Sequence, residues 1–217
     1  VLDYRNLPPA PQWKPHYDYA ASMDCVDGAA VQALLKALPA GKGRFRLLRP
    51  IAREYFEQLH EVERGNSDFY FTVSQERFRP VASEGVIELS AADEVLFQGS
   101  ERAALGDPLA SVRDGCGRKF AILRNRKVAA SAGIGSMMPD TGTKRQVIAV
   151  SGVFTEPQYR KMGLGKRLVS HATDLILRDG HVPIYWTAPD NLASHALAKA
   201  LGYWQYGTMT TYSWTKP

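Results

Sequence analysis

The chain has 217 residues, of which 45% are hydrophobic and 23% charged, with a formal net charge of +5. This is an ordinary globular composition with room for one large or two small domains, and no apolar run approaches the ~20 residues of a membrane span. The basic residues are scattered and lack the flanking aromatic side chains of a nucleic-acid platform, so we expect neither nucleic acid nor a membrane as a partner. Two cysteines allow at most one disulfide, and without a signal segment we expect a cytoplasmic monomer or homodimer.

The opening part of the chain predicts an extended arm and one helix. Proline and aromatic residues alternate up to Tyr19, which is typical of an arm that lies on a surface. Asp27 is placed to cap a helix over residues 29–38, because its carboxylate can accept hydrogen bonds from the first free N–H groups. The Pro-Ala-Gly sequence at 39–41 then ends that helix.

A second helix is predicted from Pro50 to Gly65, since its apolar residues recur at helical spacing. That stripe consists of Ile51, Tyr55, Leu59 and Val62. Short strands are expected at 69–73 and 85–89. Neither His16 nor His60 has a partner at ligand spacing, so no metal site is expected.

Strand and helix patterns alternate from residue 90 onward, as in an α/β fold. The expected elements are a helix over 90–97 with Ser90 and Asp93 at its start, a helical turn over 108–113, a hairpin of strands 120–123 and 128–137 around the turn 124–127, and a final strand over 203–214. No internal repeat is visible in the sequence.

The most informative stretch joins a strand to a helix through a glycine loop. An apolar, β-branched run over 147–154 predicts a buried strand, and Pro157 ends it because proline cannot donate to a sheet. After Gly163 and Gly165, apolar residues recur at helical spacing, and Gly180 is placed as the residue that ends this helix.

Basic residues crowd the start of this helix, where the helix dipole would favour acids. They are Arg160, Lys161, Lys166 and Arg167. Glycine lets the backbone approach a ligand, and the free N–H groups of a first turn bind phosphate. A Walker A loop is excluded because Arg167 follows Gly165-Lys166, and a dinucleotide fingerprint is excluded because Leu168 replaces its third small residue.

The remaining pattern, Arg-x-x-Gly-x-Gly between a strand and a helix, resembles the acetyl-CoA pyrophosphate loop of the GNAT superfamily of N-acetyltransferases. The likeness continues downstream from the loop. Residues 182–188 resemble the family's next strand, and residues 191–203 resemble its Asn-x-x-Ser helix that closes on Leu-Gly-aromatic. It covers about Gly85 to the C-terminus.

The resemblance implies a three-layer α/β fold with a mixed central sheet flanked by helices, plus an N-terminal α+β extension. We expect a GNAT-like domain over 85–217 and, over 1–84, an extension or a degenerate half-module. Acetyl-CoA would be the co-substrate, with no metal. The residues implied to bind it are Val153, Phe154, Thr155, Arg160, Lys161, Met162, Gly163, Leu164, Gly165, Lys166, Arg167, Asn191 and Ser194.

The implied reaction is direct transfer of an acetyl group to an amine of a small molecule or a protein. It needs donors on the carbonyl oxygen, and by resemblance these are the backbone N–H groups of Val153 or Phe154. The Tyr that many members carry seven residues after the Asn is replaced here by Ala198, and the strand lacks their Glu.

The candidates for proton transfer are therefore the side chains that lie nearby in sequence, namely Ser194, His195, Tyr203 and Glu156. Two of them also have a structural interpretation: His195 shares a helix face with Lys199 as a surface residue, and Tyr203 is placed as a core aromatic. The missing Tyr favours a second hypothesis, a non-catalytic regulatory module that binds acyl-CoA.

Overall fold

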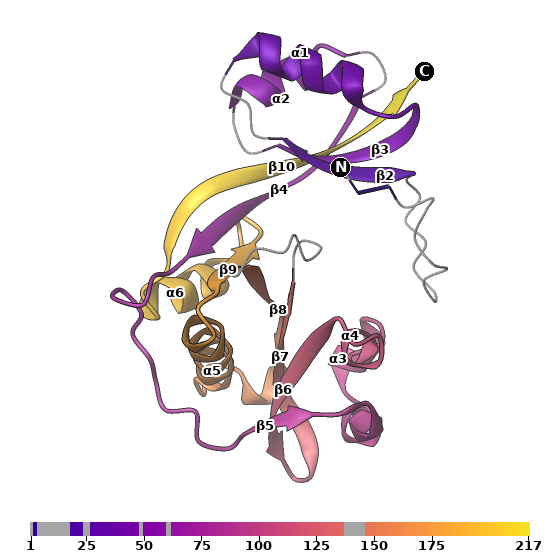
Figure 1. The fold of residues 1–217 in the computed structure, drawn as a ribbon. Helices are drawn as coiled ribbons and strands as arrows, with labels where there is room; N and C mark the ends of the chain where they lie inside the picture. Colours follow the sequence, from indigo (N-terminus) through magenta and orange to yellow (C-terminus); the bar gives the residue numbers. More distant parts are fainter. Residues whose placement is uncertain (1, 4–17, 24–26, 48–49, 60–61, 137–145) are drawn as a thin grey trace. The chain divides into compact units, whose positions relative to one another are not determined.

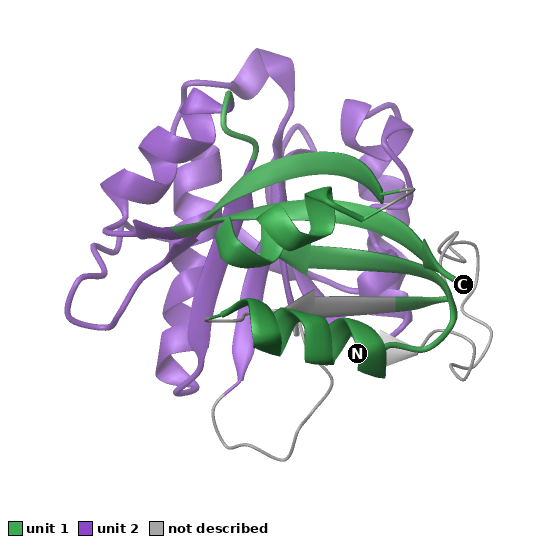
Figure 2. Ribbon diagram, turned by 90° about the horizontal axis from the view of Figure 1, so that it is seen from above, with its two compact units in different colours: residues 1–70, 188–190, 207–217 green, residues 71–187, 191–206 purple. Residues whose placement is uncertain are grey.

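The computed structural model describes residues 2–3, 18–23, 27–47, 50–59, 62–136 and 146–217 (Figure 1). The chain forms two compact units (Figure 2). The first comprises residues 1–70, 188–190 and 207–217, and the second comprises 71–187 and 191–206. The two units are defined by contacts between residues, and each consists of more than one segment of the chain. The domain boundary after residue 84 comes from sequence motifs and stays a prediction.

The first unit contains a sheet in the order β1-β2-β3-β10-β4. Its elements are β1 (Leu2–Asp3), β2 (Tyr19–Met23), α1 (Gly28–Ala37), β3 (Gly41–Leu47), α2 (Pro50–Glu57), β4 (Val62–Thr72) and most of β10 (Trp204–Lys216). Strand β2 runs parallel to β3, and β3 runs antiparallel to β10. The last residues of β4 and the first of β10 belong to the second unit.

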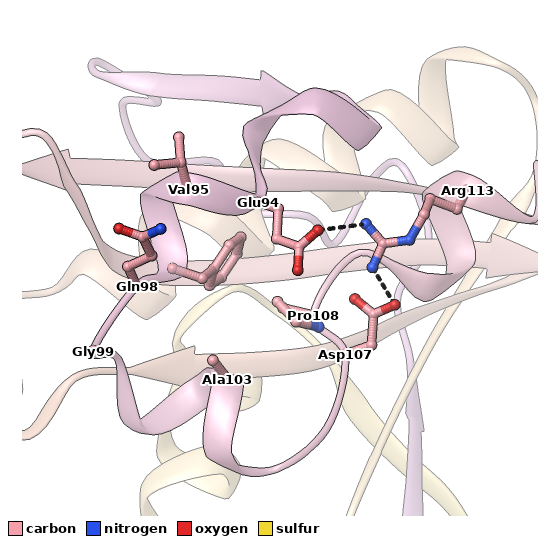
Figure 3. Close-up of a pocket in the computed structure, with 9 residues that line it drawn as sticks. Glu94, Val95, Gln98, Gly99, Ala103, Asp107, Pro108 and Arg113 are labelled. Atoms are coloured by element: carbon pink, nitrogen blue, oxygen red, sulfur yellow. Dashed lines mark hydrogen bonds and ion pairs between the residues drawn. The ribbon is translucent and has the colours of Figure 1, made fainter. Parts of the chain in front are cut away.

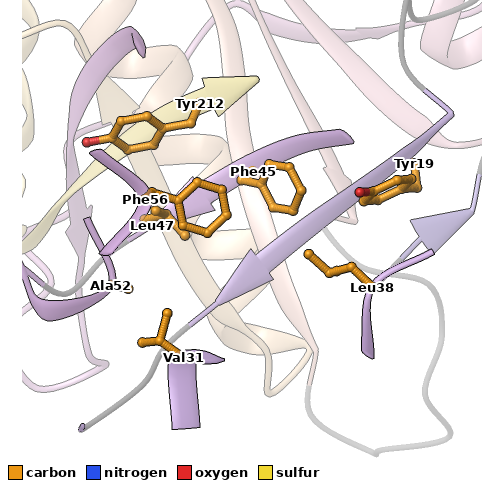
Figure 4. Packing of buried hydrophobic residues seen from close by; sticks show 8 residues of the cluster. All are labelled: Tyr19, Val31, Leu38, Phe45, Leu47, Ala52, Phe56 and Tyr212. Atoms are coloured by element: carbon orange, nitrogen blue, oxygen red, sulfur yellow. The ribbon is translucent and has the colours of Figure 1, made fainter. Parts of the chain in front are cut away.

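An aromatic core holds this unit together (Figure 4). Phe45 of β3 is fully buried, with its ring centroid 4.8 Å from that of Phe56 and 5.7 Å from that of Tyr19. The complete cluster is Tyr19, Val31, Leu38, Phe45, Leu47, Ala52, Phe56 and Tyr212. Because it draws on α1, α2 and the sheet, both helices are held to the strands by apolar burial.

The predicted first helix is confirmed, and the Asp27 carboxylate accepts a hydrogen bond from the Ala30 N–H at 2.8 Å. The predicted end of the second helix is wrong, because α2 stops at Glu57 and Val62 begins β4. Over a few residues, the apolar spacing suits a helix or a strand equally well. Pairing within the sheet makes this segment a strand, and the contact between the hydroxyl groups of Ser67 and Thr210 at 2.9 Å joins it to β10. The predicted arm falls largely on 4–17, outside the described residues.

Strand β3 was not predicted, although its sequence carries the signal. Gly43, Phe45 and Leu47 are buried and alternate with basic side chains that are more exposed. This period of two is the pattern of a strand with one face on a core.

The second unit contains a mixed sheet in the order β9-β8-β7-β6-β5. Its elements are β5 (Val86–Leu89), the 3₁₀ helix η2 (Ala91–Phe97), α3 (Glu101–Ala104), α4 (Ala110–Arg113), β6 (Gly117–Arg124), β7 (Lys127–Ser136), β8 (Val147–Thr155), the 3₁₀ turn η3 (Pro157–Tyr159), α5 (Leu164–Arg178), β9 (Val182–Thr187) and α6 (Leu192–Ala200). Strands β8 and β9 are parallel, and the other pairs are antiparallel.

Helices cover both faces of this sheet. Phe120 of β6 contacts His171 of α5, with 5.0 Å between ring centroids. Its neighbour Ala121 joins a separate cluster with Phe97 of η2 and Leu109 beside α4. Because successive residues of a strand point to opposite faces, α5 lies on one face and η2 with α4 on the other. The predicted mixed α/β sheet flanked by helices is confirmed.

Most local predictions for this unit are confirmed. The hairpin turn has positive φ at Asn125 (51°) and Arg126 (60°), as a two-residue type I′ turn requires. The helix predicted over 90–97 is a 3₁₀ helix with a kink at Asp93, whose carboxylate accepts from the backbone N–H and hydroxyl of Ser90, both at 2.7 Å. That cap was predicted, but the tighter helix type was not.

Candidate functional site

Strands β8 and β9 separate halfway along their length. Their parallel pairing runs from Val147 with Val182 to Val150 with Tyr185, and in the described chain no further pair joins them. Among the described residues, Ser151, Phe154 and Thr155 of β8 pair with β7, and no residue of 151–155 pairs with β9. The outer part of β8 therefore has one edge that is not covered by β9.

A β-bulge lies in this outer part of β8. Ser131 of β7 faces Phe154 while Gly133 faces Ser151, so β8 contains one residue more than β7 across the same interval. Gly152 has φ of +56°, which other residues rarely adopt. A bulge leaves one residue without a ladder partner and re-aims the backbone, here at Gly152 and Val153.

The loop before α5 exposes the first N–H groups of that helix. Lys161 and Gly163 both have left-handed backbone conformations, with φ of +63° and +76°. Gly163 is the N-cap, so no side chain bonds to the first turn, and that turn holds no acidic residue. Arg160 donates from Nε to the Thr155 carbonyl at 3.1 Å, which ties the loop to the end of β8. The resulting helix N-terminus is ready to bind an anion.

Gly165 brings the predicted loop against the bulged strand. A Cβ atom at this position would lie 3.4 Å from Thr155 Oγ1, 3.8 Å from Val153 Cγ1 and 3.6 Å from Leu197 Cδ1 of α6. The absence of a side chain lets the first turn of α5 approach β8 closely. Of the predicted cofactor residues, the structure thus brings together Val153, Thr155 and Gly165.

The basic residues around the loop differ in exposure. Lys166 and Arg167 are half-buried, and Arg167 Nη2 lies 3.8 Å from where a Cβ of Gly85 would be, so its side chain extends toward the start of β5. Lys161 and Met162 are exposed. Glu156 is buried instead of facing these bases, and its carboxylate accepts from the backbone N–H groups of Glu101 (3.3 Å) and Arg102 (3.5 Å).

Asn191 and Ser194 open helix α6 as the sequence predicts. The Asn191 Oδ1 accepts from the Ser194 N–H at 3.1 Å and so caps the helix. The Ser194 side chain interacts with the phenol of Tyr185, a residue that the sequence analysis missed. Burial raises the pKa of Tyr185, which keeps its phenol protonated. Since Tyr185 belongs to the last β8–β9 pair, this pair of hydroxyl groups lies where the strands separate.

The contacts of Tyr203 favour its structural interpretation. It is 3% exposed, and its hydroxyl lies 2.7 Å from Thr173 Oγ1. Thr173 Oγ1 donates to the Val169 carbonyl at 2.6 Å, so the proton shared with Tyr203 comes from the tyrosine. Burial raises the pKa of Tyr203 well above its ordinary value. His195 is half-buried, and its ring centroid lies 5.7 Å from that of Phe71.

Lys119 is the second residue that the sequence analysis missed. It lies on β6 and is only 3% exposed, and its ammonium is 3.4 Å from the carbonyl oxygen of Gly152 at the bulge. Burial lowers its pKa to about 8, and the charge of Arg102 adds to this effect. Lys119 is two residues from Ala121, so it lies on the same face of β6, the face that η2 and α4 cover. This spacing is the signal in the sequence that could have identified it.

A separate cavity of about 530 Å³ lies among η2, α3 and α4 (Figure 3). Arg113 projects into it and bonds to Asp107 and, at 3.4 Å, to Glu94. None of its lining residues was predicted to bind the cofactor. Across the described ranges, we find no cluster of three metal-ligating side chains. The helices within those ranges are all too short or too polar to cross a bilayer.

Comparison with known proteins identifies the family. The family model described as "Acetyltransferase (GNAT) family" matches residues 86–203, just over half of the chain. A search of curated proteins returned no match. Among solved structures, a putative GNAT acetyltransferase from Novosphingobium aromaticivorans is 20% identical with a TM-score of 0.58, covering 86% of this chain and 81% of its own.

Two further structures share the fold. A GCN5-related N-acetyltransferase from Kribbella flavida is 17% identical with a TM-score of 0.54, covering 79% of this chain and 67% of its own. A tandem GNAT protein from the clavulanic acid biosynthesis pathway is 14% identical with a TM-score of 0.57, and the match covers 86% of this chain and 67% of that protein. With the family model matched across the strand, loop and helix described above, the chain belongs to the GNAT family of acetyltransferases.

Proposed function

We propose that the protein transfers an acetyl group from acetyl-CoA directly to an amine of a small molecule or of a protein, in the cytoplasm. One observation carries the proposal: the uncapped N-terminus of α5 lies against the bulged outer part of β8. The first feature suits a pyrophosphate and the second suits an acyl carbonyl group. Membership of the family makes acyl transfer the reaction to test.

The loop before α5 would hold the pyrophosphate. A Cβ atom at Gly163 would meet nothing within 4 Å, so the space in front of this helix end is open to a ligand. Backbone N–H groups from Met162 to Gly165 would donate to phosphate oxygens, with Lys161, Lys166 and Arg167 supplying positive charge. Arg160 would hold the loop in place through its bond to Thr155.

The bulge would bind the acyl group, which acetyl-CoA supplies as a thioester. The N–H of Val153 or Phe154 would donate to the carbonyl oxygen as that oxygen gains negative charge. Asn191 and Ser194 would contact the cofactor from α6. Proton transfer would involve Ser194, which interacts with Tyr185, or His195, whereas the bond between Tyr203 and Thr173 supports a core role for Tyr203.

A regulatory module that binds acyl-CoA without catalysis is the second candidate. Ala198, at the position where the resemblance implies a catalytic Tyr, is fully buried and offers no proton. This observation favours binding without turnover. The two candidates share the cofactor site and differ only in chemistry.

We also propose that the N-terminal part is a degenerate half-module. The elements β2-α1-β3-α2-β4 repeat the order of β8-α5-β9-α6-β10, and in each set the first two strands are parallel. One structural neighbour carries the description of a tandem GNAT protein. Both observations support a duplicated origin in which the first copy keeps its structure and lacks the glycine loop.

Calorimetric titration with acetyl-CoA tests the binding proposal, and roughly micromolar affinity is expected. Gly163→Asp should weaken binding by more than about 100-fold, because a carboxylate would compete with phosphate for the free N–H groups. Gly163→Asn has similar shape and backbone tolerance and can cap the same N–H groups, but it lacks the negative charge that repels phosphate, so it should weaken binding by less than about 10-fold. Gly180→Asp is the strain control, since Gly180 has nearly the same φ (+77°) and equally open surroundings at the other end of α5.

Absence of binding by the unmodified protein would refute the proposal, as would equal affinities of the Asp and Asn variants at position 163. Thiol release over a panel of amines then separates the two candidates. Turnover with any amine establishes the acetyltransferase. Tight binding with no thiol release over the whole panel would favour the regulatory module.

A further inference from the structure

The Lys119 side chain crosses one strand to reach another. Lys119 on β6 is directly opposite Gly133 on β7, which is in turn opposite Ser151 on β8. A Cβ atom at Gly133 would lie 3.6 Å from Lys119 Cδ, so the aliphatic stem passes over a position that has no side chain. The ammonium then reaches the bulge, 3.4 Å from the Gly152 oxygen.

The environment of this ammonium is unusual for a lysine. Within the described residues, its one hydrogen bond is to the Gly152 carbonyl, and no carboxylate lies within ion-pair distance. Arg102, the charged group that acts on it, is also a cation. A buried cation without a carboxylate destabilises a fold, so stability does not explain this arrangement and a functional explanation is needed.

Peptide geometry links this contact to the proposed acyl site. The carbonyl of Gly152 and the N–H of Val153 belong to one planar trans peptide and point in opposite directions. A donor that binds the oxygen therefore holds the plane of the whole group and directs the N–H away from Lys119. It also polarises the N–H, which makes that group a stronger donor.

We infer that Lys119 is a positioning residue that orients and polarises the Val153 N–H for the acyl carbonyl oxygen. This inference rests on the proposed function, because it gives that N–H a ligand. Lys119 itself does not contact the acyl group. Its effect should therefore be seen in how the carbonyl is bound, and not in how the rest of CoA is bound.

The test uses the infrared stretch of acetyl-CoA labelled with ¹³C at its carbonyl, measured free and bound to the full-length protein. Binding to the wild type should lower the stretching frequency, because the oxygen accepts a hydrogen bond. Lys119→Met fills similar space without a donor and should lose most of this shift. Lys119→Gln, of nearly the same length as Met, restores an N–H donor and should recover part of it. Lys127→Met, at an exposed position of the hairpin turn, should change nothing.

CoA without an acyl group should bind to all four proteins within about twofold, since its phosphates contact another part of the site. If a reactive amine is found, Lys119→Met should lower kcat on the order of 10-fold with KM unchanged, because the hydrogen bond from Val153 weakens most where the carbonyl oxygen carries charge. Thermal unfolding shows whether each variant is folded. If Lys119→Met does not fold, Lys119→Gln is compared with the wild type instead.

Identical bound frequencies in the wild type and in Lys119→Met, with CoA bound equally to both, would overturn the role of Lys119 alone. Failure of the wild type to bind either CoA or acetyl-CoA would overturn the inference together with the proposed function. The loss and partial recovery of the shift in the Met and Gln variants would support it.

Discussion

The chain contains the same order of strands and helices twice, and the two sets differ at one helix end. In the first copy α1 follows β2, and in the second α5 follows β8. The N-terminus of α1 is closed by the Asp27 carboxylate, which accepts from the Ala30 N–H at 2.8 Å. The N-terminus of α5 begins at Gly163 and has no side-chain cap.

Within the part of the chain that the structure describes, this difference explains why only the second set carries a candidate site. N–H groups that already bond to a carboxylate of the same chain have no capacity left for phosphate, and the negative charge repels an anion. A glycine cap leaves those groups free and leaves space in front of them. The same order of elements therefore accompanies a capped helix in one set and the proposed ligand site in the other. The following predictions test that distinction.

The largest effect is expected from Phe45→Ala in the aromatic core of the first unit. Phe45 is fully buried between Tyr19 and Phe56, and removing its ring should lower the free energy of unfolding by about 3–5 kcal/mol. Acetyl-CoA affinity, measured where the variant is still folded, should change by less than about twofold. The reason is that the ring belongs to the core of the first unit, whereas the loop belongs to the second unit. A large loss of affinity in the folded variant would break the comparison.

The second effect concerns the buried charge of Lys119. Its pKa is lowered to about 8 by burial, so between that pH and about 10.5 the unfolded chain holds a proton that the folded protein has released. Its contribution to stability is therefore full above about pH 10.5 and is lost as the pH falls toward 8. Relative to Lys119→Met, the wild type should gain about 2–3 kcal/mol between pH 7 and 10.5.

Denaturant unfolding of the two proteins across this range checks the prediction. The quantity to compare is the difference between the two free energies of unfolding. Tyr212, whose pKa burial raises to about 12, is present in both proteins, so its contribution cancels in this difference. A stability difference that does not vary with pH would mean that Lys119 titrates as an exposed lysine.

Tyr203→Phe tests whether the buried hydroxyl of Tyr203 serves stability or the proposed reaction. Loss of the hydroxyl removes its bond to Thr173 and should lower the free energy of unfolding by about 1–2 kcal/mol. Binding of acetyl-CoA and kcat should both stay near wild-type values. A fall in kcat of more than about 10-fold with intact stability would instead make Tyr203 a catalytic residue.

The smallest effect compares two helix caps. Asp27→Ala and Asn191→Ala each remove a side-chain oxygen that accepts from a first-turn N–H, and each should lower stability by about 1 kcal/mol. Only Asn191→Ala should also weaken acetyl-CoA binding, because only that cap belongs to the proposed site. Equal affinity in the two variants, measured by calorimetry, would remove Asn191 from the site.

Local features of this protein were predictable from residues close together in the sequence. Asp27 and Asn191 are placed to cap helices because a short polar side chain reaches N–H groups three residues away. The turn at Asn125 follows from the backbone that a two-residue hairpin requires. The strand, glycine loop and helix over 147–178 were predictable because each depends on neighbours within one or two turns.

Features that depend on a distant partner were not predictable in this way. The end of α2 and the start of β4 were missed, because strand pairing outweighed a helical spacing that covers only a few residues. Tyr185 was not predicted because its interaction with Ser194 joins a strand to a later helix. In the same way, Lys119 reads as one of many scattered bases until the sheet brings it to Gly152.

The sequence by itself determined the family resemblance, the order of most elements and the loop with its free helix end, because glycine, proline and capping residues act through local backbone geometry. Only the tertiary structure decided where β8 leaves β9, that the strand bulges at Gly152, and that a buried ammonium meets the bulge. These features depend on which strands become neighbours. Strand pairing is set by contacts over the whole chain, and no local pattern encodes it.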